Sequence, residues 1–307
     1  MEYLIAVDGG GTKTKVLCSD LQGTIVGEGL SGPTNLTATS VGAASFNLRE
    51  GIRQATQNLG QDWQVKKMVM GLAGMDTTSE HTKAQKIFND VLVQYKINDV
   101  TLVNDIVIAL ESGTNKSDAV ALIAGTGSNC YGRSAEGKEA KVGGMDFLLT
   151  DQGSGYAIGR AVLRAAVKSY DGRIEKSALE QLVCEYFRLP SIGELKDAVY
   201  NPMLNKSEIA ALSKLCDDAF AQDDHVAKSI YDHTVFELFT MVQTVMKNTG
   251  IMERDVDLVF VGGVSTIPYV SDTLQQQLQR ICPQLSMIKP DSDPVHGALK
   301  MALRTTK

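Results

Sequence analysis

Short apolar runs, broken by glycine-rich and polar turns, open the chain. Tyr3–Val7 is an apolar run that stops at a cluster of glycines, and Lys13–Ser19 then alternates with a period of two, which predicts a strand. After a turn at residues 20–23, Thr24–Gly29 predicts a third strand. Residues 3–29 are therefore predicted to form a β-meander with the glycine cluster between its first two strands.

Helical and strand patterns alternate over the next 90 or so residues. Apolar residues at helical spacing predict helices over 41–59 and 80–95, and buried-type runs predict strands over 67–72 and 100–103. A short helix with Ile106, Ala109 and Leu110 follows. The polar segment 113–118 is the predicted domain boundary.

The second half of the chain repeats the opening pattern. Ala119–Ala124 predicts a strand, a glycine–hydroxyl turn follows at 125–128, and Asn129–Arg133 alternates like the second strand of the first half. Farther along, the segment MVMGLAG at 68–74 resembles LVFVGGV at 258–264. A repeat of this kind predicts two α/β domains of related fold.

The region between the repeated elements is predominantly helical. The apolar spacing predicts helices over 156–170, 176–187, 207–220 and 226–248, then a strand over 257–261 and helices over 274–282 and 295–303. The apolar stripe of the longest helix is interpreted as core: Phe236, Phe239, Val242, Val245 and Met246.

Composition and charge exclude several classes of protein. Of 307 residues, 43% are hydrophobic and 21% charged, which is typical of globular domains rather than disordered chains. A net charge of −6 and the lack of a basic block argue against a nucleic-acid partner. Five scattered cysteines without a CxxC pair argue against disulfides and zinc. With no long apolar run and no signal-peptide pattern, we expect no membrane segment and a cytoplasmic location.

Three glycine-rich turns, each after a predicted strand, are candidate phosphate sites. They are Asp8–Thr12 (DGGGT), Gly125–Ser128 (GTGS) and Gly262–Ser265 (GGVS). Glycine lets backbone N–H groups approach an anion closely, and Asp8 at a strand end suits Mg²⁺. The first turn leads into a strand, so it is neither a Rossmann turn nor a P-loop. One such turn could be a hairpin without a ligand, but three in a duplicated fold predict nucleotide binding.

Two further aspartates are candidates for the chemistry. Asp105 follows the strand 100–103, where a carboxylate could act as a general base in phosphoryl transfer or cap the following helix. The small and polar residues of 143–155 suit hydrogen bonds to a polyol. Within that segment, Asp151 could bind substrate or cap the next helix, and both interpretations remain open.

These motifs, taken in order, resemble the N-acetylglucosamine kinase family. That family belongs to the actin, Hsp70 and sugar-kinase superfamily, and its near relatives are the BadF/BadG/BcrA/BcrD-type ATPases that activate acyl-CoA dehydratases and reductases. The resemblance implies an α/β fold of two duplicated ribonuclease H-like (actin-like ATPase) domains with a cleft between them. It places the first domain at 1–115, with the final helix 293–307 packed back on it, and the second at 116–292 with a helical insertion.

The activity that the resemblance implies is ATP- and Mg²⁺-dependent phosphorylation of an amino sugar at its 6-hydroxyl. The first candidate reaction converts N-acetylglucosamine into N-acetylglucosamine 6-phosphate. Asp8 would organise Mg²⁺ and Asp105 would be the base. The nucleotide would contact Gly9, Gly10, Gly11, Thr12, Lys13, Gly125, Thr126, Gly127, Gly262, Gly263 and Ser265. The sugar would contact Asn35, Asp105, Ser128, Asn129, Gly144, Met145 and Asp151. Domain closure is expected, and a homodimer is common in the family.

The sequence departs from the family pattern near the sugar. The family's Trp-Gly after Gly-Gly is Met145-Asp146 here, and its Gly-Asp-Glu-Gly-Ser is residues 150–154, with Gln152 in place of the glutamate. Glucosamine, N-acetylmannosamine, N-acetylmuramic acid or a plain hexose therefore remain alternative substrates.

Two other functions compete with the kinase interpretation. An ATPase that activates a partner enzyme would carry a cluster-binding cysteine just before the second glycine turn, where Ala121–Ala124 has none. A sugar-sensing regulator would bind sugar without turnover, but no DNA-binding appendage is visible. The first of these would show ATP hydrolysis that is indifferent to sugars.

Overall fold

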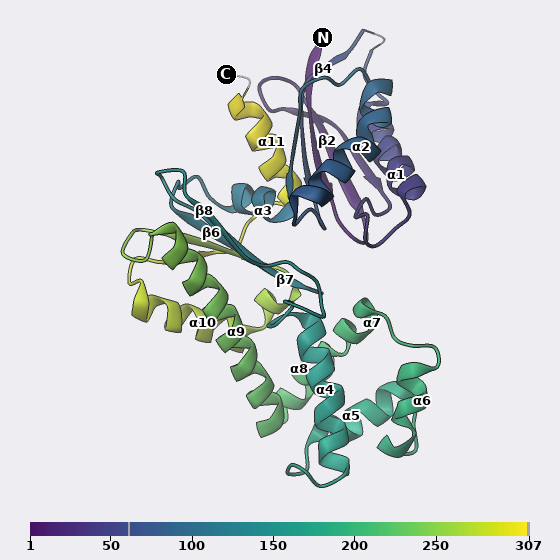
Figure 1. Ribbon diagram of the computed structural model, residues 1–307, viewed down its shortest axis with the longest axis vertical. Helices are drawn as coiled ribbons and strands as arrows, with labels where there is room; N and C mark the ends of the chain where they lie inside the picture. Colours follow the sequence, from purple (N-terminus) through teal and green to yellow (C-terminus); the bar gives the residue numbers. More distant parts are fainter. Residues whose placement is uncertain (61, 306–307) are drawn as a thin grey trace. The chain divides into compact units, whose positions relative to one another are not determined.

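The computed structural model describes residues 1–60 and 62–305 and divides into two compact units. Unit 1 is Met1–Ala121 with Ile288–Lys307, and unit 2 is Leu122–Met287. Each unit contains most of one five-stranded sheet with its helices (Figure 1). In the described part of the chain, no helix combines the length and the apolar character needed to cross a bilayer.

Unit 1 is built on a mixed sheet in the order β3-β2-β1-β4-β5. β1 pairs antiparallel with β2 and parallel with β4, and β4 pairs parallel with β5. The strands are β1 (Glu2–Gly9), β2 (Thr14–Ser19), β3 (Ile25–Ser31), β4 (Gln64–Leu72) and β5 (Val100–Asn104). The helices are α1 (Val41–Thr56), α2 (Thr78–Gln94), α3 (Asp105–Gly113) and α11 (Pro294–Thr305).

Helices cover both faces of this sheet, so alternate residues of β1 enter two different cores. Ile5 and Val7 pack in a cluster with α1 and α2, whereas Leu4 and Ala6 pack in a second cluster with α3 and α11. Strands of a sheet covered on both faces are apolar at successive positions, which explains the continuous run at 3–7. The last helix, α11, packs against α3 and β1 in the second cluster.

Unit 2 repeats the strand order of unit 1. Its sheet runs β8-β7-β6-β9-β10, which matches β3-β2-β1-β4-β5 strand for strand. The two halves of the chain therefore share one sheet topology, as the repeat in the sequence predicts. The strands are β6 (Ala119–Ala124), β7 (Ser128–Arg133), β8 (Glu139–Gly143), β9 (Asp257–Val261) and β10 (Ser286–Ile288).

The remainder of unit 2 is helical, as the sequence predicts. The helices are α4 (Gly155–Tyr170), α5 (Ala178–Phe187), α6 (Leu195–Tyr200), α7 (Lys206–Ala211), α8 (Ser213–Phe220), α9 (His225–Thr249) and α10 (Pro268–Ile281), with 3₁₀ turns η1 (Ile192–Glu194) and η2 (Gly263–Thr266).

Two details of the helical prediction are wrong. The single helix expected over 207–220 is two helices, α7 and α8, that meet at the buried Leu212, where i→i+3 hydrogen bonds tighten the chain. Phe236, expected in the core, is 60% exposed because α9 buries the face that carries Val235, Leu238 and Val242. The apolar spacing predicts that these segments are helical, but which residues face the core depends on the elements that pack around each helix.

The α11–α3 crossing requires a glycine, and this gives a stability prediction. A Cβ at Gly297 would lie 1.9 Å from the Ile108 carbonyl oxygen and 2.7 Å from the Ser112 nitrogen, both backbone atoms of α3. We expect Gly297→Ala to lower the free energy of unfolding by about 1–3 kcal/mol because the helices must separate. Gly42→Ala in α1 is the control, since its Cβ would meet nothing within 4 Å. Chemical denaturation of both variants checks this, and equal midpoints would contradict it.

Candidate functional site

The first glycine turn joins β1 to β2 in unit 1. The Gly10 nitrogen donates to the Lys13 carbonyl at 2.9 Å, and the Gly10 carbonyl accepts from the nitrogens of Thr34 and Asn35, each at 3.2 Å. A Cβ at Gly9 would lie 2.2 Å from the Thr34 hydroxyl, so a larger residue there would displace the Thr34 side chain. The tip of the turn, Gly11–Lys13, is exposed. This leaves a closely supported loop with its backbone open to a ligand.

The Asp8 carboxylate sits at the carboxyl end of β1, beside this turn. Its cross-strand partner is Lys15 of β2, whose Nζ lies 2.9 Å from Oδ2 of Asp293, just before α11. Burial and then the nearby Asp293 raise the pKa of Asp8 to about 6, against the opposing effects of Lys13 and Lys15. A divalent cation at Asp8 would favour the ionised carboxylate.

The chemistry of these donors fits magnesium better than a metal held by protein alone. Residues 1–60 and 62–305 contain no cluster of three or more Cys, His, Asp or Glu side chains that could hold a metal ion. Mg²⁺ is usually bound through one or two carboxylates together with phosphates of the substrate. Asp8 can supply such a carboxylate.

Asn35 lies against the same turn. Its Oδ1 accepts from both the nitrogen and the hydroxyl of Thr37, each at 2.8 Å. Gly74, with a φ of +74°, leaves room for the Asn35 side chain, because a Cβ there would lie 2.7 Å from Oδ1. The structure therefore holds Asn35 half-buried next to Gly11, and the sugar contact that the resemblance implies for Asn35 stays a prediction.

Asp105 is not the cap of α3. Asn104 is, because its Oδ1 accepts from the Ile106 nitrogen at 3.1 Å while its Nδ2 donates to Met75 and Asp76. Asp105 is the first residue of the helix and is half-buried. The positive end of the helix dipole stabilises a carboxylate there. The capping alternative is thus wrong, and the general-base interpretation of Asp105 stays a prediction.

In unit 2 the second and third glycine turns lie together. The Gly125 nitrogen donates to Gly127, and the Gly125 carbonyl accepts from Gly155 at the start of α4 at 2.7 Å. Gly262 has a φ of +103°, and a Cβ there would lie 2.4 Å from the Ala124 carbonyl oxygen and 2.8 Å from the Gly125 nitrogen. The Ser265 hydroxyl closes the third turn on the Gly262 carbonyl. Candidate nucleotide residues therefore lie together at the carboxyl ends of the neighbouring strands β6 and β9.

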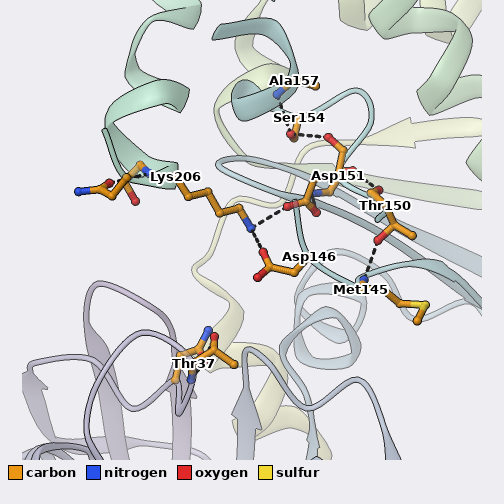
Figure 2. Close-up of polar contacts among 12 residues, drawn as sticks. Thr37, Met145, Asp146, Thr150, Asp151, Ser154, Ala157 and Lys206 are labelled. Atoms are coloured by element: carbon orange, nitrogen blue, oxygen red, sulfur yellow. Dashed lines mark hydrogen bonds and ion pairs between the residues drawn. The ribbon is translucent and has the colours of Figure 1, made fainter. Parts of the chain in front are cut away.

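Asp151 is buried against the second glycine turn. Its Oδ1 accepts from the Ser128 nitrogen at 3.0 Å, and a Cβ at Gly127 would lie within 2.9 Å of both carboxylate oxygens. Ser154, not Asp151, caps α4: its hydroxyl accepts from Ala157 and donates to the Asp151 carbonyl (Figure 2). Of the two interpretations of Asp151, the helix cap is wrong, and the substrate contact stays a prediction.

Lys206, the first residue of α7, is a residue that the sequence did not reveal. Its Nζ lies 2.6 Å from Oδ2 of Asp151 and 2.5 Å from Oδ1 of Asp146, as Figure 2 shows, and above the Phe147 ring at 5.9 Å. Burial opposes its charge, but the hydrogen bonds that Lys206 donates to the two aspartates keep the pKa of Lys206 above its usual value. No motif marks a lysine that pairs with partners more than fifty positions away.

Met145 and Asp146, which replace the Trp-Gly of the family pattern, lie in an exposed loop. Gly143 and Gly144 both have positive φ, as does Asp146 at +69°. The Met145 nitrogen donates to the Thr150 hydroxyl at 2.7 Å, while its side chain is 58% exposed. Asp146 thus has a left-handed backbone conformation, and its carboxylate pairs with Lys206.

Comparisons with known proteins agree across the whole chain. The model of the BadF/BadG/BcrA/BcrD ATPase family matches residues 5–302. The chain is 33% identical over 304 residues to the N-acetylmuramic acid/N-acetylglucosamine kinase of Clostridium acetobutylicum, with 98% of each covered. It is 28% identical over 321 residues to the N-acetyl-D-glucosamine kinase of Dictyostelium discoideum, covering all of this chain and 99% of that one.

A solved structure shares the fold. The candidate N-acetylglucosamine kinase of Chromobacterium violaceum superposes with a TM-score of 0.75 at 21% identity, over 98% of both chains. The prediction of two duplicated actin-like ATPase domains is confirmed. With a family model matched from residue 5 to residue 302, this chain belongs to the BadF/BadG/BcrA/BcrD ATPase family.

Proposed function

We propose that this protein is an ATP-dependent sugar kinase that phosphorylates the 6-hydroxyl of an amino sugar, with N-acetylglucosamine as the principal substrate. The observation that carries the proposal is the buried Asp151 carboxylate fixed against the glycine turn 125–128. A carboxylate that accepts hydrogen bonds suits sugar hydroxyls, and the turn beside it suits phosphate. The names of the two curated relatives support the same activity.

Asp105 is assigned the proton transfer. Asp105 lies in the first turn of α3, and its carboxylate can accept the proton of the sugar hydroxyl as the hydroxyl oxygen bonds to phosphorus. In phosphoryl transfer, most of the remaining rate enhancement comes from positioning and from charge stabilisation. This fits a site with one base and several backbone-lined turns.

The glycine turns are assigned to the phosphates. In unit 1 the exposed tip at Gly11–Lys13 offers backbone N–H groups, and in unit 2 the turn at Gly125–Gly127 does the same, with the Thr12 and Thr126 hydroxyls as further donors. Asp8 would hold Mg²⁺, whose charge neutralises phosphate oxygens when it is bound. The third turn, Gly262–Ser265, is assigned to the nucleoside end.

The sugar is assigned to Asn35 in unit 1 and to the Asp151 region in unit 2, with Ser128, Asn129, Gly144 and Met145. N-acetylmuramic acid is the second candidate substrate. The relative from Clostridium acetobutylicum is named for both sugars, and the exposed Met145 replaces the tryptophan of the family pattern. A smaller, mobile thioether leaves room for a bulkier substituent on the sugar ring.

A sugar panel tests the proposal. ADP release would be measured with ATP and Mg²⁺ and, in turn, N-acetylglucosamine, N-acetylmuramic acid, glucosamine, N-acetylmannosamine and glucose. We expect the first two to raise ADP release at least about tenfold over ATP alone, because the acceptor hydroxyl completes the site. ADP release that no sugar changes would favour an ATPase that activates a partner. Sugar binding without any turnover would favour a sensor.

A further inference from the structure

Helix α4 carries a row of three cations along one face. Arg160, Arg164 and Lys168 are spaced four residues apart, so their side chains leave the same side of the helix over a length of about 12 Å. All three are exposed, and within the described chain none makes an ion pair with a carboxylate. Asp171, the nearest acidic residue along the helix, is bound through both oxygens to Arg173, and Lys168 contributes last among the causes that lower the pKa of its carboxyl.

These cations line a cavity of about 430 Å³ between α4 and α9, which we call the α4–α9 groove. The two helices pack against each other in unit 2 (Figure 1). The residues lining the groove include no aspartate or glutamate. Its apolar surface comes from both helices and the segment after α4: Ala157, Ile158, Ala161, Ala165, Ile174, Val226 and Ile230.

The charge of the groove requires an explanation. Like charges at i and i+4 destabilise a helix, and a chain with a net charge of −6 has many carboxylates that could neutralise them. Arg160 is also held in place, with its guanidinium 5.7 Å from the centre of the buried Tyr156 ring. A fixed guanidinium, a second arginine and a lysine beside an apolar floor form a site for a ligand that is anionic at one end and carbon-rich at the other.

We propose that the α4–α9 groove binds a phosphorylated small molecule, at a site other than the proposed sugar site at Asp151. A phosphate monoester carries close to two negative charges at neutral pH, whereas a carboxylate carries one. A phosphate is therefore the better match for a site with three cations. Arginine offers paired N–H groups that match phosphate oxygens. A cavity of this volume is of the size that holds small-molecule ligands.

The groove also touches the loop that carries Asp151. Gln152 and Gly153 are among its lining residues. Gly153 has a φ of +75°, and a Cβ there would lie 2.7 Å from Leu238 Cδ2 of α9, so loop and helix are in close contact. A ligand in the groove would therefore contact α4, α9 and the residues next to Asp151.

Calorimetric titration of the full chain tests the site without ATP, so its outcome does not depend on the proposed kinase activity. The probes are inorganic phosphate and N-acetylglucosamine 6-phosphate at low salt. The triple variant Arg160→Gln, Arg164→Gln, Lys168→Gln is compared with Lys214→Gln, Lys247→Gln, Arg280→Gln, which removes three exposed charges of unit 2 outside the groove. We expect the groove variant to bind the sugar phosphate at least about tenfold more weakly than the control, which should match the wild type.

Both variants keep any product binding elsewhere, so the groove is identified as the binding event that the control retains and the groove variant loses, counted from the stoichiometry of the titration. We expect the sugar phosphate to bind more tightly than inorganic phosphate, since only it can use the apolar floor, and its affinity to fall with added salt. Should the triple variant melt earlier than its control, Arg164→Gln alone provides the measurement. Equal affinity of the groove and control variants, or no saturable binding of either probe to the wild type, would overturn the proposal.

Discussion

Asp105→Asn is expected to lower kcat for sugar phosphorylation by about 10²–10⁴-fold, the range that general-base catalysis contributes. The amide has the size and shape of the carboxylate but cannot accept the proton of the acceptor hydroxyl. The helix cap is unaffected, because Asn104 supplies it. Stability and sugar affinity are therefore expected to change little.

The measurement is a pair of assays on one preparation: kcat from ADP release at saturating sugar, and the sugar Kd from calorimetry. Asp90→Asn, an exposed carboxylate of α2 in the same unit, is the matched control and should keep full activity. If Asp105→Asn retains more than about a tenth of kcat, another residue is the base, because removal of a general base costs about 10²–10⁴-fold. A large loss of sugar affinity with kcat preserved would instead make Asp105 a binding residue.

The fold could be predicted from sequence because it is encoded locally. The strand after Met1 is apolar at every position from 3 to 7, and the structure covers both faces of β1 with helices. The glycine turns stand out because a Cβ at Gly9 or Gly262 would overlap neighbouring atoms. Such constraints restrict the residue type at single positions, so the positions can be recognised in the sequence as glycines that follow a strand.

Contacts between distant segments could not be predicted in this way. Lys206 reaches Asp146 and Asp151 from another helix, and Lys15 reaches Asp293 across almost the whole chain. Each is an ordinary charged residue in its own segment, so nothing local distinguishes it from a solvated surface lysine. Only the packing of α7 and α11 against the rest of their units gives these lysines their partners.

Lys206→Met is expected to raise the sugar KM by at least about tenfold and to lower the free energy of unfolding by about 1–3 kcal/mol, the usual penalty for a buried polar group that loses its partner. The side chain of Asp151 is 4% exposed, and Lys206 provides the ion pair that compensates its charge. Methionine keeps the length and apolar stem of lysine but leaves Oδ2 of Asp151 without a cation. The carboxylate would then shift from the position that the sugar requires.

Two further variants separate this positioning role from a general loss of stability. Lys206→Arg restores a cation at the same place, so we expect it to recover most of the sugar KM. Asp146→Asn removes the partner that is 61% exposed, and an exposed ion pair contributes at most about 1 kcal/mol, so the KM should change little. If Lys206→Met loses stability with an unchanged KM, or if arginine fails to restore the KM, then Lys206 supports the α7 packing rather than the position of Asp151. A rise in KM without a matching loss of kcat is the result that assigns Lys206 to the sugar site.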